Sequence, residues 1–334
     1  MTKRKTELSL LNLLMCFAVV FVHIVSWTLP QMDKSSIKYV FVLAPWRLSA
    51  FVVQGFIFLS GVKLFASQKP FRYSAFLLGR AKRILVPYLI WVCVYYTYFI
   101  RIGWYTFAWR DLAEYIFLGT LCSHFYFIII ILQFYLLLPL FRWLLAHTNV
   151  WLLCGISIVI TALFKLYVHF PYDDRVLPAF LCYFVIGAAV GKHYAKVLTW
   201  LKKYVLPLGA AFTVLGFVNV LLTYRAQTKA AVYPYFEALH LVYCLAAIFF
   251  LLALFTKVGE KCTLPGALSL CDRSSYGIYL SHVLFIYIAN DLLYRAGITD
   301  MLYTLVLRGI FTYAATLALC MGYTFIKEKF HGRS

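Results

Sequence analysis

Runs of about twenty mostly apolar residues recur along almost the whole 334-residue chain. A transmembrane helix needs ~20 such residues to cross the hydrocarbon core of a bilayer. Apolar and aromatic residues make up 64% of the chain and charged residues 13%, whereas a soluble domain carries about 45–50% and about 25%. A chain of this kind cannot form one water-soluble core. The sequence therefore predicts an all-α, polytopic membrane protein.

We count ten such runs and treat the chain, residues 1–334, as a single transmembrane domain without an appended soluble one. The first run is too long for the apolar core of a signal peptide, and no small-x-small cleavage site follows it, so we expect it to be retained. The ten predicted spans are roughly 8–29, 46–66, 84–100, 122–141, 150–168, 178–195, 203–223, 235–256, 273–290 and 302–326.

The formal net charge of +19 has a topological explanation that needs no nucleic-acid partner. Lysine and arginine concentrate in the cytoplasmic loops of membrane proteins. With the N-terminus inside, 19 of the 31 basic residues fall on the inner side, nine on the outer side and three within spans. This asymmetry predicts a multi-pass plasma-membrane protein with both termini in the cytoplasm.

The nine cysteines indicate neither a disulfide framework nor a zinc site. Their number is odd, no two form a CxxC pair, and six lie inside apolar runs, where free thiols behave as small hydrophobic side chains. We therefore expect no metal and no permanently bound cofactor.

The first span contains an ionisable residue, His23. It lies about fifteen residues into the span, which at ~1.5 Å per residue is some 22 Å from the cytoplasmic end. Ionisable side chains are costly in hydrocarbon, so each one is a functional hypothesis. A neutral imidazole at this depth can act as a general base. It can equally serve as a hydrogen-bonding contact between helices, and spacing alone does not decide between the two roles.

A polar stripe marks the ninth span. Ser275, Tyr279 and His282 stand at positions i, i+4 and i+7, which share one face of a helix. A stripe at that depth must face protein or a water-filled cavity. It can support a catalytic group, or it can join helices as a hydrogen-bonded seam; the spacing alone favours the seam.

A basic cluster, Arg80, Lys82 and Arg83, is expected at the cytoplasmic mouth of the third span. Two arginines three residues apart on one helical face suit the phosphates of a cytoplasmic ligand. Such clusters also serve as plain topology anchors. Farther along, Glu237 and His240 share a face near the outer end of the eighth span, either as an acceptor-side pair or as a solvated rim. The glycines of Gly187-x-x-x-Gly191 predict close helix packing.

Taken together, these stretches resemble the acyltransferase-3 family over nearly the whole chain. The matching segments are His23, Phe56-Ile57-Phe58-Leu59-Ser60-Gly61, Arg80-x-x-Arg83-Ile-Leu-x-Pro-Tyr, His124-Phe125-Tyr126-Phe127, Gln133-Phe134-Tyr135-x-x-x-Pro139, and Ser275-Tyr276-Gly277-Ile278-Tyr279-Leu280-x-His282. Members of this family are integral membrane acyltransferases that modify sugars and other cell-surface molecules. The chain is similar to the compact members that lack a fused soluble domain.

The resemblance implies that an acyl group, most simply acetyl, passes from cytoplasmic acyl-CoA to a hydroxyl of an extracytoplasmic glycan. His23 would be the general base, with Ser275, Tyr279 and His282 in support. Arg80, Lys82 and Arg83 would hold the CoA phosphates. Candidates for the acceptor side are Glu237, His240, His124 and Tyr126. An acyl-histidine intermediate and direct transfer both fit these residues.

One position departs from the pattern of the family. Many members carry an arginine eleven residues before the first-span histidine, and this chain has Asn12 there. An asparagine can form hydrogen bonds but carries no charge, so a donor contact through Asn12 is expected to be weaker.

A rival prediction is a flippase or exporter for a lipid-linked or polymeric glycan, because polar residues could line a transport path. Against it, the spans show no second ionisable relay and no paired broken helices that would mark an inverted repeat. A scaffold within a polysaccharide machine is a third alternative.

Overall fold

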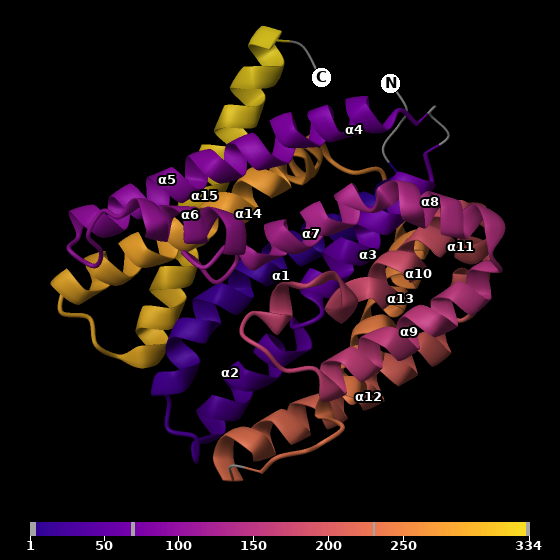
Figure 1. Ribbon diagram of the computed structural model, residues 1–334. Helices are drawn as coiled ribbons and strands as arrows, with labels where there is room; N and C mark the ends of the chain where they lie inside the picture. Colours follow the sequence, from indigo (N-terminus) through magenta and orange to yellow (C-terminus); the bar gives the residue numbers. More distant parts are fainter. Residues whose placement is uncertain (1–4, 68–70, 230, 332–334) are drawn as a thin grey trace. The chain divides into compact units, whose positions relative to one another are not determined.

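The computed structural model describes residues 5–67, 71–229 and 231–331, and within these ranges the chain contains helices and no strands (Figure 1). The chain divides into two compact units, of which the first comprises Met1–Phe56 with Ala195–Ser334 and the second Ile57–Tyr194. Each unit is described below by itself.

The first unit is built mainly from long helices. It contains α1 (Thr6–Thr28), η1 (Leu29–Gln31), α2 (Ile37–Leu48), α12 (Val205–Lys229), α13 (Phe236–Lys261), α14 (Gly266–Arg295) and α15 (Met301–His331). The helices of the second unit are α4 (Tyr73–Arg80), η2 (Ala81–Leu85), α5 (Val86–Arg101), α6 (Trp109–Leu118), α7 (Tyr126–Leu136), α8 (Leu138–His147), α9 (Val150–Tyr167), η3 (Asp173–Arg175), η4 (Leu177–Phe180) and α10 (Leu181–Lys192). Two helices pass from one unit to the other, α3 (Val52–Phe65) and α11 (Tyr194–Lys203).

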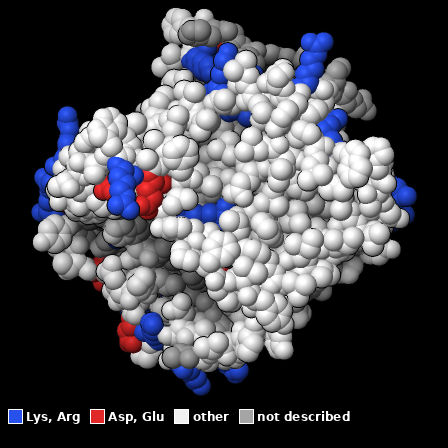
Figure 2. All heavy atoms as spheres, viewed as in Figure 1, with Lys and Arg blue, Asp and Glu red and all other residues white. Residues whose placement is uncertain are grey.

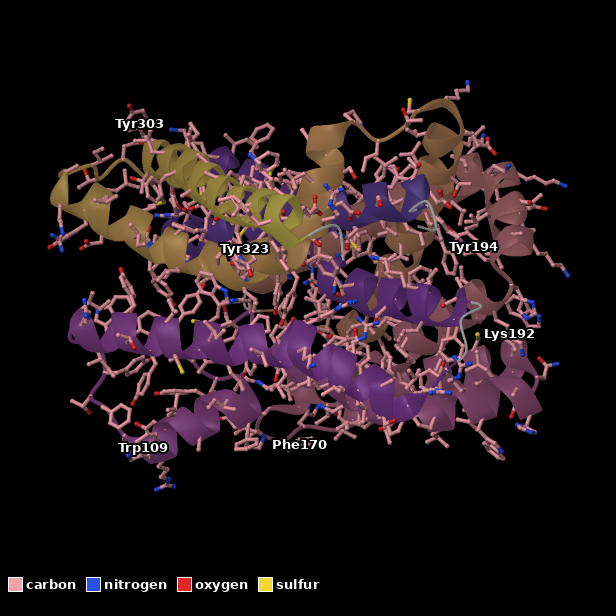
Figure 3. All side chains as sticks on the ribbon, turned by 90° about the horizontal axis from the view of Figure 1, so that it is seen from above. Trp109, Phe170, Lys192, Tyr194, Tyr303 and Tyr323 are labelled. Atoms are coloured by element: carbon pink, nitrogen blue, oxygen red, sulfur yellow. The ribbon has the colours of Figure 1, made fainter. Side chains whose placement is uncertain are left out.

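The described helices agree with the predicted number of spans. Eight helical stretches are long and apolar enough to cross a membrane, and two bent pairs raise this number to ten if each pair is one span. The bent pairs are α7 with α8, at 54°, and Leu177–Lys192 with α11, at 101°, so the expectation that no spans are broken does not hold for the described residues. Figure 3 labels Lys192 and Tyr194, which flank the second bend.

Two helical stretches begin well before the predicted spans. The second stretch begins at Ile37 and its predicted span at residue 46, and the third begins at Tyr73 and its predicted span at residue 84. Each stretch has 29 residues, more than the ~20 that a span needs, so the early helix starts do not contradict the predicted spans. In the second span the Ser36 hydroxyl accepts a hydrogen bond from the Lys38 amide and caps α2, an arrangement that starts a helix irrespective of hydropathy.

In the first unit, α1 packs against α13, α14 and α15, and its Leu11, Met15 and Val20 side chains are fully buried or nearly so. Helices α14 and α15 run antiparallel. Ser274 donates a hydrogen bond to Thr324 at 2.9 Å, and Arg273 pairs with Glu328. We call the end of this unit where α1 begins the Thr6 end and the opposite one the Thr28 end.

In the second unit, glycines bring the backbones of α3 and α10 into direct contact. A methyl group added at Gly187 would collide with the Phe58 backbone, and one at Gly61 would collide with the backbone of Phe184 and Ala188. Small residues allow this approach between membrane helices. The predicted close packing around Gly187 is confirmed, and Gly61 in the apolar-Ser-Gly segment has the same structural role.

Large apolar side chains cover much of the outer surface, as expected for helices that face lipid. Exposed examples include Ile90, Phe217 and Val214. On the face shown in Figure 2, charged side chains are sparse among uncharged atoms. Trp109, at the start of α6, is 75% exposed and is labelled in Figure 3; an exposed tryptophan at a helix end is typical of a membrane interface.

Candidate functional site

Two histidines from the first and ninth predicted spans meet inside the first unit. The ring centroids of His23 on α1 and His282 on α14 lie 5.1 Å apart, and the ring planes are inclined by 51°. His282 is completely buried, whereas His23 remains partly accessible. The structure therefore brings together the two imidazoles that the sequence singled out independently.

The backbone of α14 fixes the tautomer of His282. Its Nδ1 atom lies 2.8 Å from the Tyr279 carbonyl oxygen and 3.1 Å from that of Ile278. Carbonyl oxygens can only accept, so Nδ1 carries the proton, and in the neutral ring the lone pair is on Nε2. An imidazole held in this way presents an acceptor nitrogen at the other edge of its ring.

The polar stripe of α14 faces α1, as its helical spacing requires. At one end of the stripe, the Asn12 amide donates a hydrogen bond to the Ser275 hydroxyl at 3.1 Å. At the other end, the ring of His282 contacts the ring of His23. Tyr279 lies between them along the helix, largely buried, with its ring centroid 6.2 Å from that of His282.

A buried carboxylate that the sequence analysis missed joins this stripe. Asp272 is 5% exposed and accepts hydrogen bonds from the Asn12 amide at 2.7 Å and from the Ser9 hydroxyl at 2.9 Å. The Asn12 amide is thus engaged by Asp272 and Ser275. The available signal was its spacing, because Asp272 precedes Ser275 by three residues and therefore shares its face.

The basic cluster belongs to the second unit, with Arg80 at the end of α4 and Lys82 and Arg83 in a π-helical turn. Residues Ala81–Leu85 form this turn between α4 and α5, and the Val86 amide donates to the Ala81 carbonyl. Pro87 accounts for it, since its ring lacks an N–H and would collide with the carbonyl of Arg83 four residues earlier. Single π-helical turns are frequent at functional sites.

The three basic side chains differ in their surroundings. The Arg80 guanidinium lies over the rings of Phe76 and Tyr135, 5.1 Å and 5.0 Å from their centroids. Lys82 and Arg83 are exposed. The cluster lies seven or more residues after the start of the helical stretch at Tyr73, and this stretch of 29 residues is longer than the ~20 residues that a span needs, so its place at the mouth of the span stays a prediction.

Of the four candidate acceptor-side residues, two lie in the first unit. Glu237 and His240 are on the first turns of α13, near the Thr28 end. The His240 Nε2 atom lies 3.5 Å from the Cys244 sulfur, and its ring stacks on that of Tyr243. Beside them, Arg47 covers the ring of Phe236.

The other two candidates, His124 and Tyr126, are in the second unit. His124 is 1% exposed and packs against the rings of Tyr95 and Phe125. Tyr126 begins α7. Farther along α7, the Gln133 amide donates to the Arg175 carbonyl at 2.7 Å and accepts from the Leu177 amide at 2.9 Å, which agrees with a structural contact.

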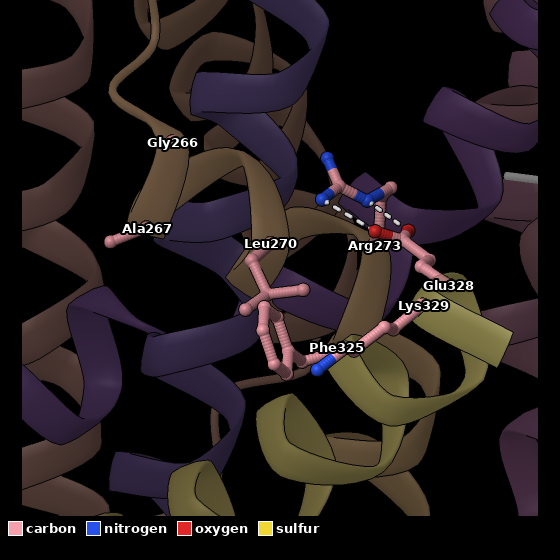
Figure 4. A pocket seen from close by; sticks show the side chains of 7 residues that line it. All are labelled: Gly266, Ala267, Leu270, Arg273, Phe325, Glu328 and Lys329. Carbon is pink, nitrogen blue, oxygen red and sulfur yellow. Dashed lines mark hydrogen bonds and ion pairs between the residues drawn. The ribbon is translucent and has the colours of Figure 1, made fainter. Parts of the chain in front are cut away.

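An open groove of about 410 Å³ lies at the Thr6 end, where α14 begins and α15 ends (Figure 4). Leu270 and Phe325 form its apolar part, and Lys329 lies at its edge. The Arg273 guanidinium binds both carboxylate oxygens of Glu328, at 2.6 Å and 3.1 Å. This two-pronged pair fastens the ends of the two helices.

Comparison with known proteins decides the family. The sequence model of the acyltransferase domain, the acyltransferase-3 family, matches residues 6–325. This chain belongs to that family. It is 26% identical over 306 residues to the putative membrane-bound acyltransferase YfiQ of Bacillus subtilis (strain 168), covering 86% of this chain and 82% of the relative.

A second protein similar to this chain is the probable poly-beta-1,6-N-acetyl-D-glucosamine export protein of Staphylococcus aureus (strain MRSA252). The two are 24% identical over 300 residues, which cover 84% of this chain and 82% of the relative. No solved structure matches the chain. The family and the helices together make this chain a multi-pass membrane acyltransferase.

Proposed function

We propose that this acyltransferase moves an acyl group, most simply acetyl, from cytoplasmic acyl-CoA to a hydroxyl of an extracytoplasmic glycan at the plasma membrane, with His23 as the general base. The observation that carries the proposal is the contact between His23 and His282, two imidazoles on neighbouring predicted spans whose ring centroids lie 5.1 Å apart. Ionisable groups at such depth mark functional sites.

In the proposed step, the partly accessible His23 ring removes the proton of the acceptor hydroxyl as the oxygen attacks the thioester carbonyl. The bond from carbon to the new oxygen forms, the carbon–sulfur bond breaks, and the CoA thiolate leaves with the proton from the His23 imidazolium. No other co-reactant is needed.

His282 acts as the positioning residue for this base. Its Nδ1 proton is committed to the Tyr279 and Ile278 carbonyls. Nε2 is then an acceptor that can take an N–H from His23, which would leave the lone pair of the catalytic imidazole toward the acceptor hydroxyl. Tyr279 and Ser275 keep the surrounding face of α14 polar.

The test is the transfer of radiolabel from acetyl-CoA to cell-envelope glycan by purified protein in lipid nanodiscs. We expect His23→Ala to lower the rate about 10²- to 10⁴-fold, the usual contribution of a general base. His169→Ala is the matched control, because His169 is an exposed histidine paired with Asp173. A folded His23→Ala protein that transfers label at the wild-type rate would show that the base is another group.

The second relative supports one other candidate function, glycan export, since its name describes a probable export protein. The same preparation separates the two. Label on the glycan supports acyltransfer, whereas movement of glycan across the membrane without labelling supports export.

A further inference from the structure

Arg308 of α15 is an arginine buried within a membrane span, and the proposed chemistry does not use it. It is 6% exposed. Since a side chain that faces lipid counts as exposed in the isolated protein, this value places Arg308 against protein. Within the part of the chain that the structure describes, no carboxylate lies at ion-pair distance from its guanidinium. A buried cation without an anion is costly, and functional sites are where such groups are retained.

The hydrogen bonds of Arg308 satisfy only part of its guanidinium. Nη1 donates to the Thr28 hydroxyl at 2.9 Å and, more weakly, to the Ile24 carbonyl at 3.4 Å. The buried Nε atom has no hydrogen-bond partner. One turn and two turns farther along α15, the hydroxyls of Thr312 and Thr316 are also buried without partners. Buried donors without an acceptor are rare in folded proteins, so the Arg308 Nε proton is one that a bound group can use.

The position of Arg308 relates it to the histidine pair. Ile24 directly follows His23, and its carbonyl points along α1 toward the Thr28 end, whereas helical side chains lean toward the N-terminus. The guanidinium therefore lies on the Thr28 side of the His23 ring. It is about one helical turn away along the axis, or ~5 Å. The pairing of Ser274 with Thr324 sets the register of α14 against α15 and puts Asn290, whose buried amide atoms also have no partners, at the same level.

We infer that Arg308 binds an anionic group of the acceptor, a carboxylate or a phosphate, while a neighbouring hydroxyl reaches His23. The inference rests on the proposed function, which brings the acceptor from the Thr28 end. An oxyanion would use the Nε proton and neutralise the buried cation, because guanidinium binds such groups through two parallel hydrogen bonds. The acceptor is thus an acidic or phosphorylated saccharide.

The experiment measures thermal stabilisation of the full-length protein in nanodiscs by glucuronate, glucose 6-phosphate and glucose, titrated at constant ionic strength. We expect at least one of the two anionic sugars to bind wild-type protein at least tenfold more tightly than glucose does. Arg308→Gln should abolish this preference. The two anionic sugars distinguish a carboxylate from a phosphate.

Arg295→Gln is the matched control, because Arg295 is an exposed arginine near the Thr28 end that pairs with Asp291; it should keep the preference. Equal binding of all three sugars to wild-type protein would overturn the inference, and so would an anion preference that survives in Arg308→Gln. If Arg308→Gln does not fold, Arg308→Lys should keep a weakened preference, and an unweakened one overturns the inference. The assay needs no acyl donor, so its failure leaves the proposed acyltransfer standing.

Discussion

At the scale of single residues, the Asp272 carboxyl group shows how this protein provides partners for a buried polar side chain. Asn12 and Ser9 donate to its two oxygens. Asn12 occupies the position where many family members are expected to carry arginine, and here its amide satisfies Asp272 without adding a charge.

We expect Asn12→Ala to destabilise the protein by about 1–3 kcal/mol, the cost of leaving a buried acceptor without its donor. Unfolding in mild detergent measures the effect. The double variant with Asp272→Ala should be less destabilised than the sum of the two single ones, because each single variant already loses the hydrogen bond between Asn12 and Asp272 and the double variant loses it only once. Strict additivity would mean that the bond contributes nothing.

At the scale of elements, the π-helical turn follows Arg80 and carries the other two residues of the basic cluster, Lys82 and Arg83. The turn contributes geometry as well as charge. Its π-helical hydrogen bonds, which Pro87 favours, change the angle around the helix axis between Arg80 and Arg83. If this turn presents both guanidinium groups to the CoA phosphates, both the charges and the geometry should matter.

We expect Arg80→Gln with Arg83→Gln to weaken acetyl-CoA binding tenfold or more in calorimetry, since two charge-assisted contacts are lost. Pro87→Ala keeps every charge and should produce a smaller loss. Arg110→Gln, which removes an exposed charge from α6, serves as the control. Unchanged affinity in the double variant would leave the arginines as topology anchors.

At the scale of the whole molecule, an even number of spans would return both ends of the chain to one side of the membrane. Cys262, between α13 and α14, is exposed near the Thr6 end, and Lys34 contacts Gln227 near the Thr28 end. The loop charges predict that the Thr6 end is cytoplasmic.

A membrane-impermeant maleimide tests this orientation in intact cells. We expect Lys34→Cys in a Cys262→Ser background to be labelled, and Cys262 of the wild-type chain to be labelled only after lysis. Labelling of Cys262 in intact cells would reverse the assignment.

Hydropathy predicted the eight single helical stretches that can cross a membrane, and the two further spans if each bent pair is one span, because each span needs about twenty apolar residues whatever its partners. It did not predict the helix starts at Ile37 and Tyr73, because a helix can extend beyond the segment that crosses the membrane. The spacing of Ser275 and His282 predicted a shared face. Which helix that face meets depends on packing, so sequence reasoning could not place Asn12 against Asp272. Arg308 was not singled out from the sequence, because it was only counted among the three basic residues that fall within the predicted spans.

The meeting of His23 and His282 also bears on biosynthesis. One imidazole emerges from the ribosome among the first residues and the other near the end of translation, so the pair forms only after the penultimate long helix has entered the bilayer. A truncated or stalled chain would therefore lack the contact between the two histidines.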